Sequence, residues 1–191
     1  MNVFVSYGAA SRQWAERLKA DLAQHGIEVW SDHTGLTTGQ NFVEQIEQAV
    51  RQADAIILLI APQTRPDEKQ NLTWQAALEA VWSDEAKRLI PFLLGDAEPP
   101  AFTRSTVPPD DYLSVIRARD PQQDWEQAIQ NLVALLRNEA APNQVERIPA
   151  VTEADRAAQR QYSAELHKYI QDLKAELPAD PAEWRSRAVQ R

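Results

Sequence analysis

The sequence alternates short apolar runs with longer segments whose apolar residues recur every three or four positions. The clearest runs are Ala-Ile-Ile-Leu-Leu-Ile at 55–60 and Leu-Ile-Pro-Phe-Leu-Leu at 89–94. Near the start of the chain, Trp14, Leu18 and Leu22 recur at four-residue steps, which is the spacing of one helix face. Because unbroken apolar runs are typical of strands buried on both faces, the chain is constrained to alternating strands and helices.

This alternation repeats about five times in the first 137 residues. We expect strands at 2–7, 27–30, 54–61, 88–94 and 112–116, and helices at 11–25, 41–50, 71–82 and 121–137. The order predicts about five parallel strands between two helix layers, a three-layer α/β sandwich whose ligands bind at the carboxyl ends of the strands. Gly26 is expected to end the first helix, and Pro91 favours an edge or a bulge for its strand.

Composition limits the classes of function. The chain has 191 residues, with 20 Lys and Arg against 28 Asp and Glu, and no Cys. Its net charge of −8 argues against a surface for nucleic acid or anionic membranes, and zero Cys excludes disulfides and thiolate metal sites. No apolar run reaches membrane-spanning length and no signal peptide is apparent, so a cytoplasmic location is expected.

The charge divides the chain into two parts. Residues 1–140 contain 20 acidic and 12 basic residues, whereas 141–191 contain 8 of each. We expect a domain at 1–138, a Pro-containing linker at 139–150 and a helical C-terminal extension at 151–191. One stripe of the extension is apolar and needs a partner surface: Tyr162, Leu166, Tyr169, Ile170, Leu173 and Leu177. The main domain, a second copy or a further segment would each provide one.

Common nucleotide and catalytic motifs are absent. The chain has only 5 Gly and contains neither G-x-G-x-x-G, nor the phosphate-binding G-x-x-x-x-G-K-[ST], nor the G-x-S-x-G elbow. His25, His33 and His167 lie far apart in the sequence, without the spacing of metal ligands. No metal site is therefore predicted.

Five segments in order match a known family. They are Val-Phe-Val-Ser-Tyr at 3–7, Gly-Ile-Glu-Val-Trp-Ser-Asp at 26–32, Leu-Thr-Thr-Gly at 36–39, Asp-Ala-Ile-Ile-Leu-Leu-Ile-Ala-Pro at 54–62 and Lys-Arg-Leu-Ile-Pro-Phe-Leu-Leu at 87–94. Over about residues 1–138 the chain resembles a bacterial Toll/interleukin-1 receptor (TIR) domain. The resemblance implies a flavodoxin-like fold, and it implies that the loop 31–40 packs against neighbouring TIR domains.

The resemblance also implies two kinds of activity. Some TIR domains are adaptors that signal by TIR–TIR assembly, whereas many bacterial and plant members look like NAD⁺ glycohydrolases. These take NAD⁺ as a substrate, not as a cofactor, and cleave the bond between nicotinamide and ribose. Such chemistry needs a carboxylate near the ribose, where positive charge develops.

The sequence departs from the family at that carboxylate, which the resemblance places on the helix after the third strand. One alignment puts Thr73 in the Glu position, and another puts Gln75 there. Gln75 matches Glu in shape but lacks its charge. Glu79, one turn further on, is either a displaced acid or a solvated helix residue. Three explanations remain: natural loss of catalysis, an introduced Glu→Gln change at position 75, or a different register.

Other candidate ligand contacts lie at the expected strand ends. Ser6 and Tyr7 end the first strand, and Asp32 follows the second, where it either binds a ribose hydroxyl or shapes the loop. The residues 8–10, Gly-Ala-Ala, replace arginines that the family carries after its first strand. This weakens a phosphate-holding role for that loop.

Two tryptophans have the size and flatness to stack on nicotinamide or adenine. For Trp30 we favour a place in the core, and for Trp74 both roles stay open because it neighbours the candidate Glu position. Arg65, Lys69 and the loop between them are expected to be solvated, with phosphate binding as the less favoured alternative.

Three functions are compatible with the sequence. The first is an effector of bacterial immunity that resembles NAD⁺ glycohydrolases, is disabled in this sequence and self-associates through TIR–TIR contacts including the loop 31–40. The second is a binding-only TIR scaffold, and the third is a small-molecule receiver. A sensor or effector module linked through 151–191 is a possible partner.

Overall fold

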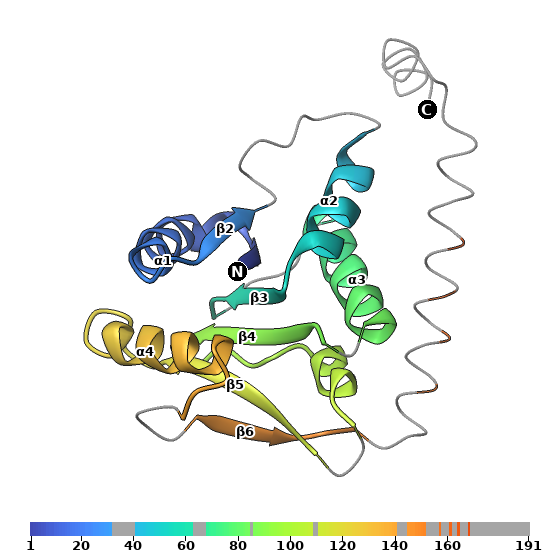
Figure 1. The fold of residues 1–191 in the computed structure, drawn as a ribbon. Helices are drawn as coiled ribbons and strands as arrows, with labels where there is room; N and C mark the ends of the chain where they lie inside the picture. Colours follow the sequence, from blue (N-terminus) through green and yellow to red (C-terminus); the bar gives the residue numbers. More distant parts are fainter. Residues whose placement is uncertain are drawn as a thin grey trace.

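Six strands form one sheet within the residues that the computed structural model describes, in the order β2-β1-β3-β4-β5-β6 (Figure 1). Their bounds are β1 (Asn2–Tyr7), β2 (Glu28–Ser31), β3 (Ala55–Ile60), β4 (Arg88–Leu94), β5 (Tyr112–Ala118) and β6 (Glu146–Pro149). The first five strands are parallel, and β6 pairs antiparallel with β5.

The described residues are 1–31, 41–62, 68–84, 86–108, 111–140 and 145–151, together with Ala157, Gln161, Ala164 and Lys168. Within these, the side chains of 41–44, 68–72 and 82 are not described.

Helices cover both faces of the sheet (Figure 1). They are α1 (Arg12–Gln24), α2 (Asn41–Gln52), α3 (Glu68–Ser83) and α4 (Trp125–Leu136), with 3-10 segments η1 (Ala9–Ser11) and η2 (Ala101–Thr106). Residues of α1 and α4 share one buried cluster with the sheet, and residues of α2 and α3 share another. The predicted three-layer, flavodoxin-like α/β sandwich is confirmed.

Alternation along β1 assigns its side chains to the two layers. Val3 and Val5 belong to the cluster under α1 and α4, whereas Phe4 belongs to the cluster under α2 and α3. All six side chains of β3 are buried because helices cover this strand on both faces. Burial of this apolar surface is the main force that holds the layers together.

The end of α1 follows the sequence closely. Gly26 has φ +73°, and its N–H donates to the carbonyl oxygen of Ala23 at 3.0 Å. The N–H of Ile27 donates to the carbonyl oxygen of Leu22 at 3.1 Å. These two bonds form a Schellman motif, in which glycine adopts the left-handed conformation at little cost.

Two features differ from the sequence-based prediction. Pro91 lies in an inner strand, since β4 runs between β3 and β5, and it is paired with Leu58. Pairing with β5 begins only at Phe92, one residue later. Secondly, β6 falls inside the segment 139–150 that we expected to be a linker, so part of that segment belongs to the sheet.

The C-terminal extension is described at only a few positions. Ala157, Gln161, Ala164 and Lys168 are helical and exposed, and their spacing places them on one helix face. The apolar stripe of the extension lies outside the described residues, and the domain bounds at 138 and 151 stay predictions. Among the described helices, none is long and apolar enough to cross a membrane.

Candidate functional site

The carboxyl ends of the parallel strands meet at one edge of the sheet, where α/β folds bind ligands. β1 ends there at Tyr7, and β3 ends there at Ile60. Since α3 begins at Glu68, soon after β3, its first turns start from this edge. α3 packs against β1, β4, α2 and η2, so it contributes the helical wall of the candidate site.

The two β1 residues predicted to contact ligand point to opposite sides of the sheet. Tyr7 belongs to the buried cluster under α1 and α4. Ser6, its neighbour, therefore faces the layer of α2 and α3. Ser6 is fully buried, and its Oγ has no hydrogen-bond partner among the described residues. The structure thus places Ser6, and not Tyr7, on the side of the sheet that α3 covers.

Ser11 is a second buried serine that the sequence did not single out. It ends η1, soon after β1, and it is fully buried, with no hydrogen-bond partner for its Oγ in the part of the chain that the structure describes. Its backbone N–H donates to the carbonyl oxygen of Gly8 at 2.9 Å. A Ser at the start of a predicted helix is usually a cap, yet Ser11 makes no side-chain cap hydrogen bond.

The two alternatives for the Glu position differ in exposure. Thr73 is fully buried, whereas Gln75 and Glu79 are only partly buried. The Nε2 of Gln75 donates to Oε1 of Glu79 at 3.2 Å, joining the two side chains across one helical turn. The backbone oxygen of Glu79 also accepts from Oγ of Ser83 at 2.7 Å. The structure therefore brings Gln75 and Glu79 together as one polar pair.

Trp74 lies in the core beside these residues. Its relative exposure is 9%, and its ring packs against Phe102 of η2 with centroids 5.5 Å apart. Within the described residues, the indole Nε1 has no hydrogen-bond partner. Of the two roles that the sequence left open for Trp74, this packing favours the core aromatic over the stacking surface.

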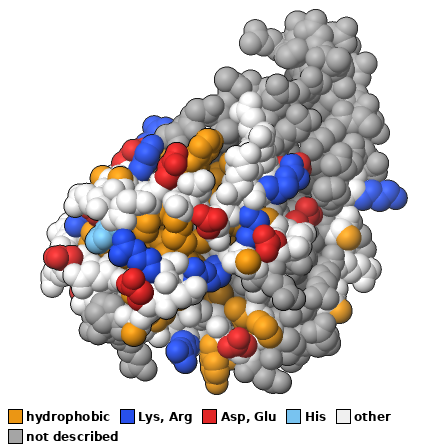
Figure 2. All heavy atoms as spheres, in the orientation of Figure 1, with side chains coloured by type: hydrophobic (Ala, Val, Ile, Leu, Met, Phe, Trp, Pro, Cys, Tyr) orange, Lys and Arg blue, Asp and Glu red, His pale blue; other side chains and the backbone are white. Residues whose placement is uncertain are grey.

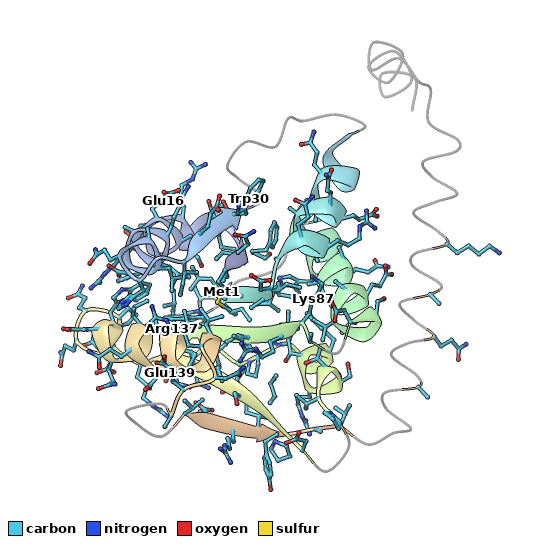
Figure 3. The ribbon with its side chains drawn as sticks, viewed as in Figure 1. Met1, Glu16, Trp30, Lys87, Arg137 and Glu139 are labelled. Atoms are coloured by element: carbon cyan, nitrogen blue, oxygen red, sulfur yellow. The ribbon has the colours of Figure 1, made fainter. Side chains whose placement is uncertain are left out.

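Trp30 is not a core residue, and that expectation is wrong. Half of its surface is exposed, and its Nε1 donates to Oε1 of Glu28 at 3.2 Å. The reason is topological: β2 is the end strand of the sheet, so a helix need not cover both of its faces. Figure 3 labels Trp30 beside β2.

Several predicted site residues lie outside the described part of the chain. Asp32, Arg65 and the loop 32–40 have no described backbone, and Lys69 has no described side chain. Their roles at the site therefore stay predictions.

A cluster of charged residues joins β6 to the rest of the sheet, and sequence reasoning missed it. Arg117 of β5 donates from Nε to Oε2 of Glu146 at 2.7 Å and from Nη2 to Oε1 at 3.1 Å. Its Nη1 donates to the carbonyl oxygen of Ala97 at 2.7 Å. The hydrogen bond from Arg117 lowers the pKa of Glu146, and the same bond raises the pKa of Arg117. The partners are 29 residues apart, so no local pattern indicates this pair.

Comparison with known proteins assigns the fold to a family. A family model described as TIR domain matches residues 3–133. The chain belongs to the TIR domain family. Residues 3–133 include all of β1 except Asn2, all of β2 to β5 and most of α4, so the TIR match spans the five parallel strands.

Two solved structures support this TIR fold. The TIR domain of the Toll-related receptor TRR-2 from Hydra magnipapillata superimposes with a TM-score of 0.54 at 23% identity, covering 71% of this chain and 98% of that chain. A prokaryotic SEFIR domain gives a TM-score of 0.51 at 18% identity, covering 71% and 97%. At these identities the likeness shows the fold alone. No curated protein matches the chain.

Proposed function

We propose that this TIR domain acts by association with other TIR domains and does not cleave NAD⁺ in its present sequence. One observation carries the proposal: neither candidate for the catalytic Glu position is a carboxylate. Thr73 is fully buried, and Gln75 presents an amide that already donates to Glu79. Family membership supports the association, because TIR domains typically self-associate.

The reaction chemistry explains why the lack of a carboxylate at positions 73 and 75 matters. Cleavage of a nicotinamide–ribose bond builds positive charge at the ribose, and a fixed negative charge nearby lowers the barrier. An amide supplies a dipole in place of a full charge. Removing one preorganised electrostatic group typically slows such chemistry by about 10²- to 10³-fold.

A second candidate function keeps catalysis, with Glu79 as the acid. Glu79 is partly buried on α3, one helical turn from Gln75. Against this role, its Oε1 accepts the Gln75 amide, which competes with a ribose hydroxyl for that oxygen.

Loss of NAD⁺ at high protein concentration separates the two functions. We expect no cleavage by the natural sequence, and a gain of cleavage in Gln75→Glu if position 75 is the family Glu position. A gain in Thr73→Glu alone would assign the other register. Cleavage by the natural sequence that disappears in Glu79→Gln would overturn the proposal in favour of the second candidate.

Particle size as a function of concentration tests the association. Sedimentation velocity of the full chain should show larger species as concentration rises. A strict monomer at every concentration would contradict the proposed assembly.

A further inference from the structure

The two end strands of the sheet differ in how their outer edges are protected. An unpaired edge presents free backbone groups to other chains, and natural proteins guard it with charged residues or Pro. β6 carries Arg147, which is exposed, and ends in Pro149. β2 reads Glu-Val-Trp-Ser, so it has no Pro, and its one charged side chain, Glu28, accepts a hydrogen bond from the indole of Trp30 on the same strand. Among the described residues, no strand pairs with the outer edge of β2.

Backbone hydrogen bonding fixes which residue of β2 faces outward. The N–H of Glu28 donates to the carbonyl oxygen of Met1 at 3.1 Å, so the backbone of Glu28 faces β1. In a parallel pair, alternate residues direct both their N–H and their C=O to the same neighbour. Trp30 therefore also faces β1, and the N–H and C=O of Val29 point away from the sheet.

The side chains of β2 add a donor and an acceptor to this edge. Trp30 is 50% exposed, and its indole N–H is held by Glu28 at 3.2 Å on the same face of the strand. Asn2, Val3, Ala49, Gln52 and Ala53 line a shallow hollow beside the indole. An exposed indole, a carboxylate and an outward-facing backbone N–H and C=O thus lie within one short strand.

We propose that the outer edge of β2 pairs antiparallel with the same edge of a second copy, about a two-fold axis at Val29. The two Val29 residues then exchange both N–H to O=C bonds. Trp30 of each copy lies opposite Glu28 of the other, on the same face of the joined sheet. This inference rests on the proposed TIR–TIR association and names one of its contact surfaces.

A second copy fits this edge because the strand is complementary to itself. The two-fold axis opposes an indole donor and a carboxylate acceptor, and it separates the two Glu28 carboxylates, which would repel if directly opposite. The contact is small, well below the roughly 800 Å² per partner of a stable interface, and each chain carries a net charge of −8. Pairing should therefore be weak alone and favoured by high concentration and salt.

Disulfide trapping tests the register, because the chain has no natural Cys. At a hydrogen-bonded antiparallel pair the Cα atoms lie about 5.5 Å apart, within the range of a disulfide. Under mild oxidation, Val29→Cys should form a covalent dimer at least about fivefold more than Glu28→Cys, whose Cα atoms would lie beyond about 7 Å. Val29 is less exposed than Glu28, so accessibility would favour the opposite result.

Tyr112 of β5, toward the opposite end of the sheet from β2, supplies a control because it is 51% exposed, against 50% for Trp30. Tyr112→Cys should cross-link no more than Glu28→Cys. Equal cross-linking of all three variants would overturn the proposal. In sedimentation experiments, Trp30→Gln should weaken association, whereas Tyr112→Gln should not.

The outcomes separate this inference from the proposed function. If the natural chain associates but Val29→Cys gives no excess of covalent dimer and Trp30→Gln has no effect, the β2 contact is wrong and TIR–TIR association stands. If the natural chain never associates and no variant cross-links, both proposals fail.

Discussion

At the scale of single residues, the Gln75–Glu79 hydrogen bond decides what a carboxylate at position 75 would do to the protein. The amide now donates to the acid across one turn of α3. A Glu in its place would set two negative charges at i and i+4, an arrangement that destabilises helices. Introducing Glu at position 75 therefore has a cost in stability.

Gln75→Glu should lower the free energy of unfolding by about 1 kcal/mol, from the lost hydrogen bond and the like-charge pair. Adding Glu79→Gln should recover most of this loss, because a donor and an acceptor are again paired. Urea unfolding of both single variants and the double variant at pH 7 measures the effect. A double variant no more stable than Gln75→Glu would contradict the pairing.

Thr73→Glu should be far more damaging than Gln75→Glu. Thr73 is fully buried, so a carboxylate there must lose its hydration or displace α3. We expect a loss of roughly 3 kcal/mol or more in urea unfolding. Equal stability of the two Glu variants would show that position 73 reaches solvent more easily than its burial indicates.

The sequence could not choose between positions 73 and 75. α3 carries apolar residues around much of its circumference, so the 3.6-residue period does not mark one face clearly. Tertiary packing, in which α3 contacts α2, η2, β1 and β4, buries Thr73 and leaves Gln75 partly exposed. Trp30 was misassigned because the sequence does not show the order of the strands. An aromatic residue in a predicted strand is expected in the core unless that strand is known to lie at the end of the sheet.

At the scale of elements, β6 depends on long-range contacts more than on its own sequence. Arg104 of η2 donates from Nε to the carbonyl oxygen of Pro149 at 2.8 Å, and Arg117 holds Glu146 from β5. No side chain of β6 is fully buried. This strand is therefore held by charged and backbone hydrogen bonds, with little apolar burial.

Glu146→Gln should lower the free energy of unfolding at pH 7 by about 1 kcal/mol, a modest value because Glu146 is more than a third exposed. The pKa of Glu146 is lowered in the folded state by Arg117. Its contribution is therefore present above the ordinary Glu pKa and is lost as pH falls through the folded-state value. Urea unfolding at pH 7 and at acid pH should show the difference between the variant and the unaltered chain shrink as the pH falls.

Arg147→Gln is the matched control for this prediction, because Arg147 is the exposed neighbour of Glu146 on the same strand. It should change stability by less than about 0.5 kcal/mol at either pH. An equal loss in both variants would contradict the role of the Arg117 pair.

The contrast between strands held by apolar burial and a strand held by distant partners explains which elements could be predicted from the sequence. β3 and β4 are inner strands with unbroken apolar runs, so their own residues predict strands. β6 has four residues and one Pro, and its pairing is set by partners in β5 and η2. Pro91 favoured an edge strand or a bulge, yet β4 is an inner strand. A Pro is compatible with an inner strand here because pairing with β5 begins only at the next residue.

At the scale of the whole molecule, the net charge of −8 acts against association of identical chains. On the face shown in Figure 2, the coloured acidic and basic side chains are interspersed and form no large area of one sign. Repulsion between copies should therefore come from the overall charge more than from one acidic patch.

Raising the ionic strength should promote self-association at fixed protein concentration. The Debye length falls from about 8 Å at 0.15 M salt to about 3 Å at 1 M, which screens long-range repulsion and leaves short contacts intact. Sedimentation velocity across this range should show a rising weight-average mass. A fall in mass with salt would indicate instead that attractive ion pairs dominate the contact.

The placement of β6 has a mechanical consequence for the C-terminal extension. The extension leaves the sheet after Pro149, which is paired with Tyr112 at the first residue of β5. A pull on the extension would first load Val151 and Ala150, whose N–H groups donate to the carbonyl oxygens of Arg104 and Asp111 at 3.4 Å and 3.0 Å. The pairs Pro149–Tyr112 and Ile148–Leu113 would follow, one after another. Strands that open in this way resist little force. A partner that exerts force on the extension would therefore detach β6 and expose the edge of β5 before it disturbs the five parallel strands.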